Sequence, residues 1–164
     1  MEIILSEDIV PGYLEDVRNI LINEEFLMLS RYVQHQWTTR LMHSVNVSYI
    51  SWLIAKKLGG NTKTVARAGL LHDFCLYDFK EKSPTGEHQL FYHPKVAAKN
   101  SDEVFGISEQ ERNAILTHMF PLGPMPRNKE AWIITVADKI CATMEFCHIN
   151  IALARRNRVR VVGA

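Results

Sequence analysis

The chain has 164 residues, of which 47% are apolar and 23% are charged, and its formal net charge is +1. This length and composition fit one domain over 1–164 with a core of its own, and they exclude a disordered chain. The small net charge excludes a long-range electrostatic attraction to nucleic acid. The cysteines have no CxxC or zinc-finger spacing, and no stretch approaches the roughly 20 apolar residues of a membrane span. We therefore expect a cytoplasmic protein with reduced thiols, no membrane partner and a locally basic C-terminal tail over 152–164.

Apolar residues at helical spacing predict two helices in the first sixty residues. The first covers 11–29, opens at a proline and is expected to pack on the rest of the domain. The second begins at Thr38-Thr39, whose hydroxyls suit an N-cap, and ends at Gly59-Gly60. His43 lies on the apolar stripe of this helix, four residues before Val47, so its side chain is expected to point inward.

A third helix, capped by Asn61, is predicted to end at the doublet His72-Asp73, so that one helix end offers an imidazole and a carboxylate together. The polar stretch that follows, over about 77–90, contains proline and glycine and is predicted to be a loop. Irregular segments of this length in compact domains are commonly functional, so this loop is a candidate lid over a substrate. Its His88 could protonate a leaving group or simply be solvated.

Three more helices are predicted toward the C-terminus. Pro94, directly after His93, suits the first turn of a helix that closes near Gly106. Ser108 begins a capping box for a helix over 112–119, whose last turn carries His118. The last helix is predicted over 130–151, with Asp138 at the edge of its apolar face. The buried stripe of that helix is expected to consist of Trp132, Ile133, Val136, Ile140 and Met144. No two-residue alternation supports a sheet, so the predicted fold class is all-α.

Several side chains able to bind a metal fall in or beside these apolar stretches. They are His43, His72, Asp73, His93, His118 and Asp138. Each alone could be an ordinary core or surface residue, but buried imidazoles and carboxylates are costly unless they are paired or bound to a metal. Helical bundles assemble metal sites from such inward-facing residues. Imidazole with carboxylate suits Fe, Mn, Zn, Co or Ni and argues against calcium. Two cations sharing Asp73 would use the whole set and would favour hydrolysis of a phosphoester or phosphoanhydride.

The pattern of His43, then Ala-Gly-Leu-Leu-His72-Asp73, then Val-Ala-Asp138-Lys resembles the HD-domain metal-dependent phosphohydrolase superfamily over about residues 40–146. The resemblance implies an HD-domain helical bundle with these residues as metal ligands. His93 in Phe-Tyr-His-Pro and His118 in Ile-Leu-Thr-His resemble the branch whose members bind two metals, commonly iron or manganese. Within that branch, the run from residue 92 to residue 140 is similar to the bacterial symmetrical dinucleoside-tetraphosphate (Ap4A) hydrolases.

This resemblance implies a metal-activated hydroxide as nucleophile, with Asp73 orienting the metal pair, and a small phosphorylated substrate such as a nucleotide or a dinucleoside polyphosphate. Lys139 is a candidate for catalysis and for binding a substrate phosphate, and Lys95 and Arg127 are further candidates for binding substrate. Arg40, one turn before His43, is a candidate partner for a ligand carboxylate. Two alternatives stay open on the same ligands: a di-iron oxygenase and a non-catalytic metal-binding regulatory domain. A homodimer also stays open.

Overall fold

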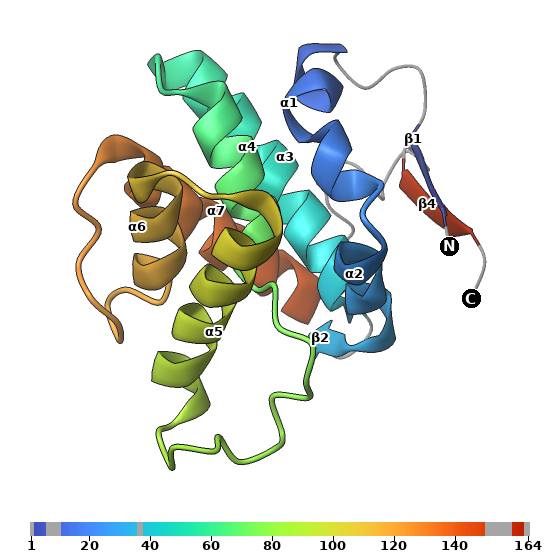
Figure 1. Ribbon diagram of the computed structural model, residues 1–164. Coiled ribbons are helices and arrows are strands. Elements are labelled where there is room, and N and C mark those ends of the chain that lie inside the picture. Colours follow the sequence, from blue (N-terminus) through green and yellow to red (C-terminus); the bar gives the residue numbers. More distant parts are fainter. Residues whose placement is uncertain (1, 6–10, 36–37, 150–158, 163–164) are drawn as a thin grey trace.

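Helices dominate the computed structural model, which describes residues 2–5, 11–35, 38–149 and 159–162 (Figure 1). The all-α class expected from the sequence is confirmed. Within the described residues the α-helices are α1 (Pro11–Leu21), α2 (Glu24–Leu27), α3 (Arg40–Leu58), α4 (Thr62–Leu71), α5 (Gln89–Phe105), α6 (Glu109–Thr117) and α7 (Lys129–Phe146). A 3-10 helix, η1 (Met28–Arg31), follows α2. None of these helices is long and apolar enough to cross a membrane.

The prediction of one continuous helix over 11–29 is wrong, because the chain leaves the helical conformation at Asn23. This residue has an extended backbone, with φ −78° and ψ 128°, and its side chain accepts a hydrogen bond from the backbone N–H of Phe26. An asparagine side chain competes in this way with the helical backbone and favours a new N-cap. The segment is therefore split into α1, α2 and η1, and it buries Phe26 and Leu27 in the main core.

Helices α3 and α4 form the centre of the bundle and pack directly against each other (Figure 1). The predicted caps are confirmed: the side chain of Thr39 caps α3, and that of Asn61 caps α4. The two helices approach closely at Gly69, where an added Cβ would lie 2.6 Å from the Cα of Ser48. This close approach is possible because glycine has no side chain, and it places the end of α4 beside the first turns of α3.

The next two helices begin earlier than the sequence suggested. Helix α5 starts at Gln89, because the side chain of His88 accepts a hydrogen bond from the N–H of Leu90 and caps the helix; Pro94 therefore lies inside α5 and does not open it. The capping box at Ser108 is confirmed, although α6 begins directly after it. Between α4 and α5 the chain is irregular as far as His88, in agreement with the predicted loop.

The last helix faces the core differently from the prediction. Its buried residues include Ile133, as predicted, together with Ile134, Ala137 and Cys141, whereas Trp132 and Val136 are 37% and 46% exposed. Ile140 is exposed as well, at 41%. Two neighbouring stripes of α7 are apolar, so periodicity alone could not choose between them; packing against α3 and α6 selects the one that is buried. The helix ends at Phe146, not at 151.

Two short antiparallel ribbons, which the sequence did not predict, flank the bundle. Strand β1 (Glu2–Leu5) pairs with β4 (Val159–Val162), so these two segments from opposite parts of the sequence lie side by side (Figure 1). Most of the tail expected over 152–164 lies outside the described residues. Strand β2 (Val33–His35) pairs with β3 (Thr38–Thr39), immediately before α3. This second ribbon places its residues beside the candidate site.

Candidate metal centre

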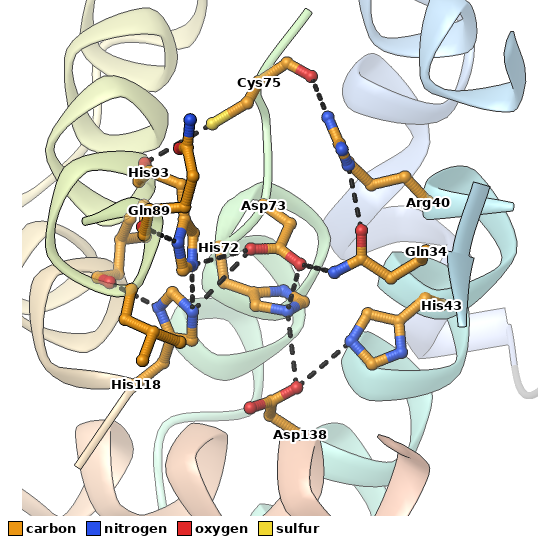
Figure 2. A network of polar contacts seen from close by, with 12 residues as sticks. Gln34, Arg40, His43, His72, Asp73, Cys75, Gln89, His93, His118 and Asp138 are labelled. Atoms are coloured by element: carbon orange, nitrogen blue, oxygen red, sulfur yellow. Dashed lines mark hydrogen bonds and ion pairs between the residues drawn. The ribbon is translucent and has the colours of Figure 1, made fainter. Parts of the chain in front are cut away.

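Helices α3, α4, α5, α6 and α7 bring imidazoles and carboxylates to one point inside the bundle (Figure 2). The side chains that meet there are His43, His72, Asp73, His93, His118 and Asp138. Two groups of donors have all their ligand atoms within 4.8 Å of one another: His43, His72 and Asp73 form the first, and Asp73, His93 and His118 the second. The structure therefore brings together every residue that the sequence singled out as a metal ligand.

Asp73 belongs to both groups, and its two oxygens face different partners. Its Oδ1 lies 3.3 Å from Nε2 of His93 and 3.7 Å from Nε2 of His118, while its Oδ2 lies 3.5 Å from Nε2 of His72. On the other side of the cluster, Oδ1 of Asp138 lies 3.7 Å from the same nitrogen of His72. The carboxylate of Asp73 therefore faces both groups of imidazoles, one through each oxygen.

The outer nitrogens of three imidazoles are held by the backbone. The Nδ1 atoms of His72, His93 and His118 each contact a carbonyl oxygen three or four residues earlier, at 2.8, 2.6 and 2.7 Å respectively. A carbonyl can only accept, so Nδ1 carries the proton and the Nε2 lone pair points into the cluster, as in metal-ligating histidines. Nε2 of His93 and Nε2 of His118 are only 3.0 Å apart. Two facing lone pairs repel each other, and a cation held by His93 and His118 would remove that repulsion.

Two buried atoms at the centre have no hydrogen-bond partner: Nε2 of His72 and Oδ1 of Asp73. Leaving a buried polar atom unsatisfied costs about 1–3 kcal/mol. Both atoms are good donors to a divalent cation, and both point toward the other members of the cluster (Figure 2). The residues present therefore fit a metal site.

Glu145, which the sequence reasoning missed, completes the surroundings of His43. Its Oε2 lies 2.8 Å from Nδ1 of His43, and its Oε1 accepts a hydrogen bond of 3.1 Å from the amide of Asn46. Nε2 of His43 lies 3.1 Å from Oδ1 of Asp138. Burial by itself would lower the pKa of His43, but the hydrogen bonds with Asp138 and Glu145 outweigh it and raise that pKa to about 10. One signal could have revealed Glu145: it lies seven residues after Asp138, on the same face of α7.

The remaining pKa shifts produce the protonation states that a metal site needs. Burial would raise the pKa of Asp73, but the surrounding imidazoles, that of His72 first, hold it well below its usual range. The pKa of Asp138 is shifted in the same direction by its hydrogen bond with His43, against the effect of burial. Burial and then the neighbouring His72 lower the pKa of His118 to about 3. Asp73 and Asp138 are therefore ionised and His118 is neutral, which are the forms that bind cations. His43, whose pKa is raised, must give up a proton before its imidazole can bind a metal.

A cavity of about 420 Å³ opens onto this cluster. Lys139 and His88 line it, and the ammonium of Lys139 donates a 2.9 Å hydrogen bond to the carbonyl of His118. The other two predicted substrate-binding residues do not line it. Lys95 forms an ion pair with Glu87 beside a neighbouring cavity, and Arg127 lines a third one. Their sequence positions gave no indication of which side of their helix or loop they occupy.

A helical bundle with a buried cluster of histidines and aspartates defines a metal-binding domain of the kind found in hydrolases. Residues 40–143 match the model of the HD domain, and the chain belongs to this family. The family consists generally of metal-dependent phosphohydrolases, which act on phosphorylated small molecules or on nucleic acids. Among similar proteins, Ribonuclease Y from Mesoplasma florum is 38% identical over 104 residues, which are 63% of this chain. The match spans only 18% of the length of that relative.

Proposed function

We propose that the protein is a phosphohydrolase that works with two divalent cations, most simply Fe or Mn. One would be held by His43, His72, Asp73 and Asp138, and the other by Asp73, His93 and His118. The observation that carries this proposal is the position of the Asp73 carboxylate, whose oxygens face the two groups of imidazoles separately. Cations bound there would supply a hydroxide at neutral pH and would neutralise charge on phosphoryl oxygens.

The cavity favours a small phosphorylated substrate over a nucleic acid. Its volume lies in the usual range for small-molecule sites, and apolar side chains such as Phe79, Leu90 and Met119 form much of its wall. Among the described residues that line it, Lys139 is the one lysine or arginine. Binding of RNA relies on a series of cationic contacts to successive phosphates. We infer a nucleotide or a related small molecule as substrate, with dinucleoside polyphosphates as the first candidates.

Three residues of the chain have proposed roles around the cations. Asp73 would hold both cations in place and so orient them toward the substrate. Lys139, which is half-buried at the cavity wall, binds a phosphate oxygen of the substrate; burial lowers its pKa, while the adjacent Asp138 acts in the opposite direction. His88 is exposed at the rim, where it can give a proton to a leaving group. Lys95 and Arg127 receive no role, since neither lines this cavity.

Metal analysis of protein purified without chelator tests the site. We expect two equivalents of metal in the wild type and one in His118→Ala, whereas the control His88→Ala keeps both. A single equivalent in the wild type would refute the two-cation proposal.

A substrate screen tests the reaction. Under anaerobic conditions with Mn or Fe(II), we expect hydrolysis of nucleotides or dinucleoside polyphosphates in preference to single-stranded RNA. Preference for RNA would overturn the substrate class. Oxygen consumption coupled to product would identify the oxygenase alternative, and bound metal without turnover of any substrate would favour the regulatory one.

A further inference from the structure

The ribbon beside the site contributes a polar side chain, that of Gln34, which is not among the predicted metal ligands. We propose that Gln34 and Arg40 act as a positioning pair, which holds the carboxylate of Asp73 in the orientation that serves both cation positions. This inference rests on the proposed two-cation site. It concerns what fixes the shared ligand, and not which residues bind the metals.

Gln34 lies in β2 and joins Arg40 to Asp73 (Figure 2). Its Nε2 donates a 2.5 Å hydrogen bond to Oδ2 of Asp73, and its Oε1 accepts a 3.0 Å hydrogen bond from Nε of Arg40. An arginine can only donate, so the amide oxygen must face Arg40 and the amide nitrogen must face the carboxylate. The orientation of the Gln34 amide is therefore determined by its neighbour.

Arg40 is itself fixed on several sides. It is fully buried, and its Nη1 donates to the carbonyl oxygens of Cys75 and Tyr77 at 2.5 and 2.9 Å. The guanidinium carbon lies 3.7 Å from the centre of the Phe79 ring and 5.0 Å from that of Tyr32. These contacts tie the start of α3 to the segment that follows Asp73. A planar, multiply bonded guanidinium of this kind has little freedom to move.

The consequence for Asp73 is a fixed rotation of its carboxylate. The terminal torsion of an aspartate is soft, so the group would otherwise turn easily. With Oδ2 held by Gln34, Oδ1 is directed toward His93 and His118, where it has no hydrogen-bond partner of its own. Gln34 and Arg40 would thus orient one oxygen of Asp73 toward each proposed cation position before a cation binds. The sequence suggested Arg40 as a partner for a ligand carboxylate; the structure shows that the contact is made through Gln34.

The test compares metal affinities by titration against a competing chelator. Gln34→Met keeps the length of the side chain and removes both hydrogen bonds, and we expect cation affinity to fall about 10- to 100-fold. Gln89→Met is the matched control. Among the described residues its side chain bonds to Tyr77 and to the Glu81 carbonyl, and although it lines the same cavity, metal affinity should not change. Affinity equal to the wild type in Gln34→Met would overturn the inference.

A second comparison separates positioning from general damage to the fold. Arg40→Lys keeps the charge but cannot make the same set of contacts, and we expect it to weaken metal binding. Because Arg40 acts through Gln34, the double variant should bind metal no more weakly than Gln34→Met alone. Losses that simply add would refute the pair. If the wild type bound one cation, the two-cation proposal would fail, while a weaker affinity in Gln34→Met would still support positioning of Asp73.

Discussion

Replacing Glu145 tests how the outer nitrogen of His43 contributes to metal binding. Glu145 is buried and accepts hydrogen bonds from both His43 and Asn46. In Glu145→Gln the new amide has nearly the same shape, and its oxygen can still accept from Nδ1 of His43. Its NH2 group then faces Asn46, whose amide can turn to meet it, because Oδ1 of Asn46 is buried without a hydrogen-bond partner. The substitution therefore removes a negative charge and changes the packing little.

We expect Glu145→Gln to bind one of two cations about 10- to 100-fold more weakly, which corresponds to about 1.4–2.7 kcal/mol. The affected cation should be the one proposed at His43, because a neutral amide polarises the imidazole less than a carboxylate does. Glu145→Leu removes the buried acceptor of two hydrogen bonds, one with Nδ1 of His43 and one with the amide of Asn46, at a cost of about 1–3 kcal/mol each. Against a typical total stability of about 5–15 kcal/mol, this loss should lower the melting temperature clearly.

The assay is a chelator-competition titration of each variant, accompanied by thermal unfolding of the metal-free protein. The cation proposed at His93 and His118 serves as the internal control, since the described hydrogen bonds of the Glu145 side chain go to His43 and Asn46. If Glu145→Gln bound both cations as tightly as the wild type, the proposed effect of the carboxylate on His43 would be refuted. An unchanged melting temperature in Glu145→Leu would show that these hydrogen bonds contribute nothing to stability.

Three further predictions concern the fold and the cavity. Gly69→Ala places a Cβ 2.6 Å from the Cα of Ser48 and 2.9 Å from its backbone nitrogen, so α3 and α4 must separate. We expect the free energy of unfolding, measured with denaturant, to fall by at least about 1–3 kcal/mol. A change near zero would contradict the close packing. Ser108→Ala removes the N-cap of α6, which also pairs with Glu111, and should cost about 1 kcal/mol in the same assay, whereas full stability would show that the cap is dispensable. Lys139→Met removes a cation from the cavity wall and should raise the KM for a phosphorylated substrate about tenfold or more, with metal content unchanged; an unaltered KM would remove Lys139 from the substrate site.

The sequence was sufficient for the helices that have strong end signals. Thr39, Asn61 and Ser108 each cap a helix through a local hydrogen bond, and local chemistry of this kind can be read directly from the residue order. The same reasoning failed at Asn23, because a cap in the middle of an apolar helical pattern resembles an ordinary polar residue on its exposed face. It failed again for α7, whose two adjacent apolar stripes are equivalent until neighbouring helices cover one of them.

Some residues of the candidate site could likewise be predicted from the sequence, and others could not. Histidines and aspartates in apolar stretches are conspicuous in a sequence, because burying them without a partner is costly, and so the residue order alone was enough to single out His72 and Asp73. It was not enough for Glu145 and Gln34, since glutamate and glutamine are common on helices and ribbons and carry no sign of their partners. Only the tertiary structure brings Glu145 to His43, 102 positions away in the chain, and Gln34 to Asp73, 39 positions away. The chain itself determined which groups can bind a cation; the packing of distant segments decided how those groups are oriented, because hydrogen bonds act over about 3 Å and do not depend on separation in sequence.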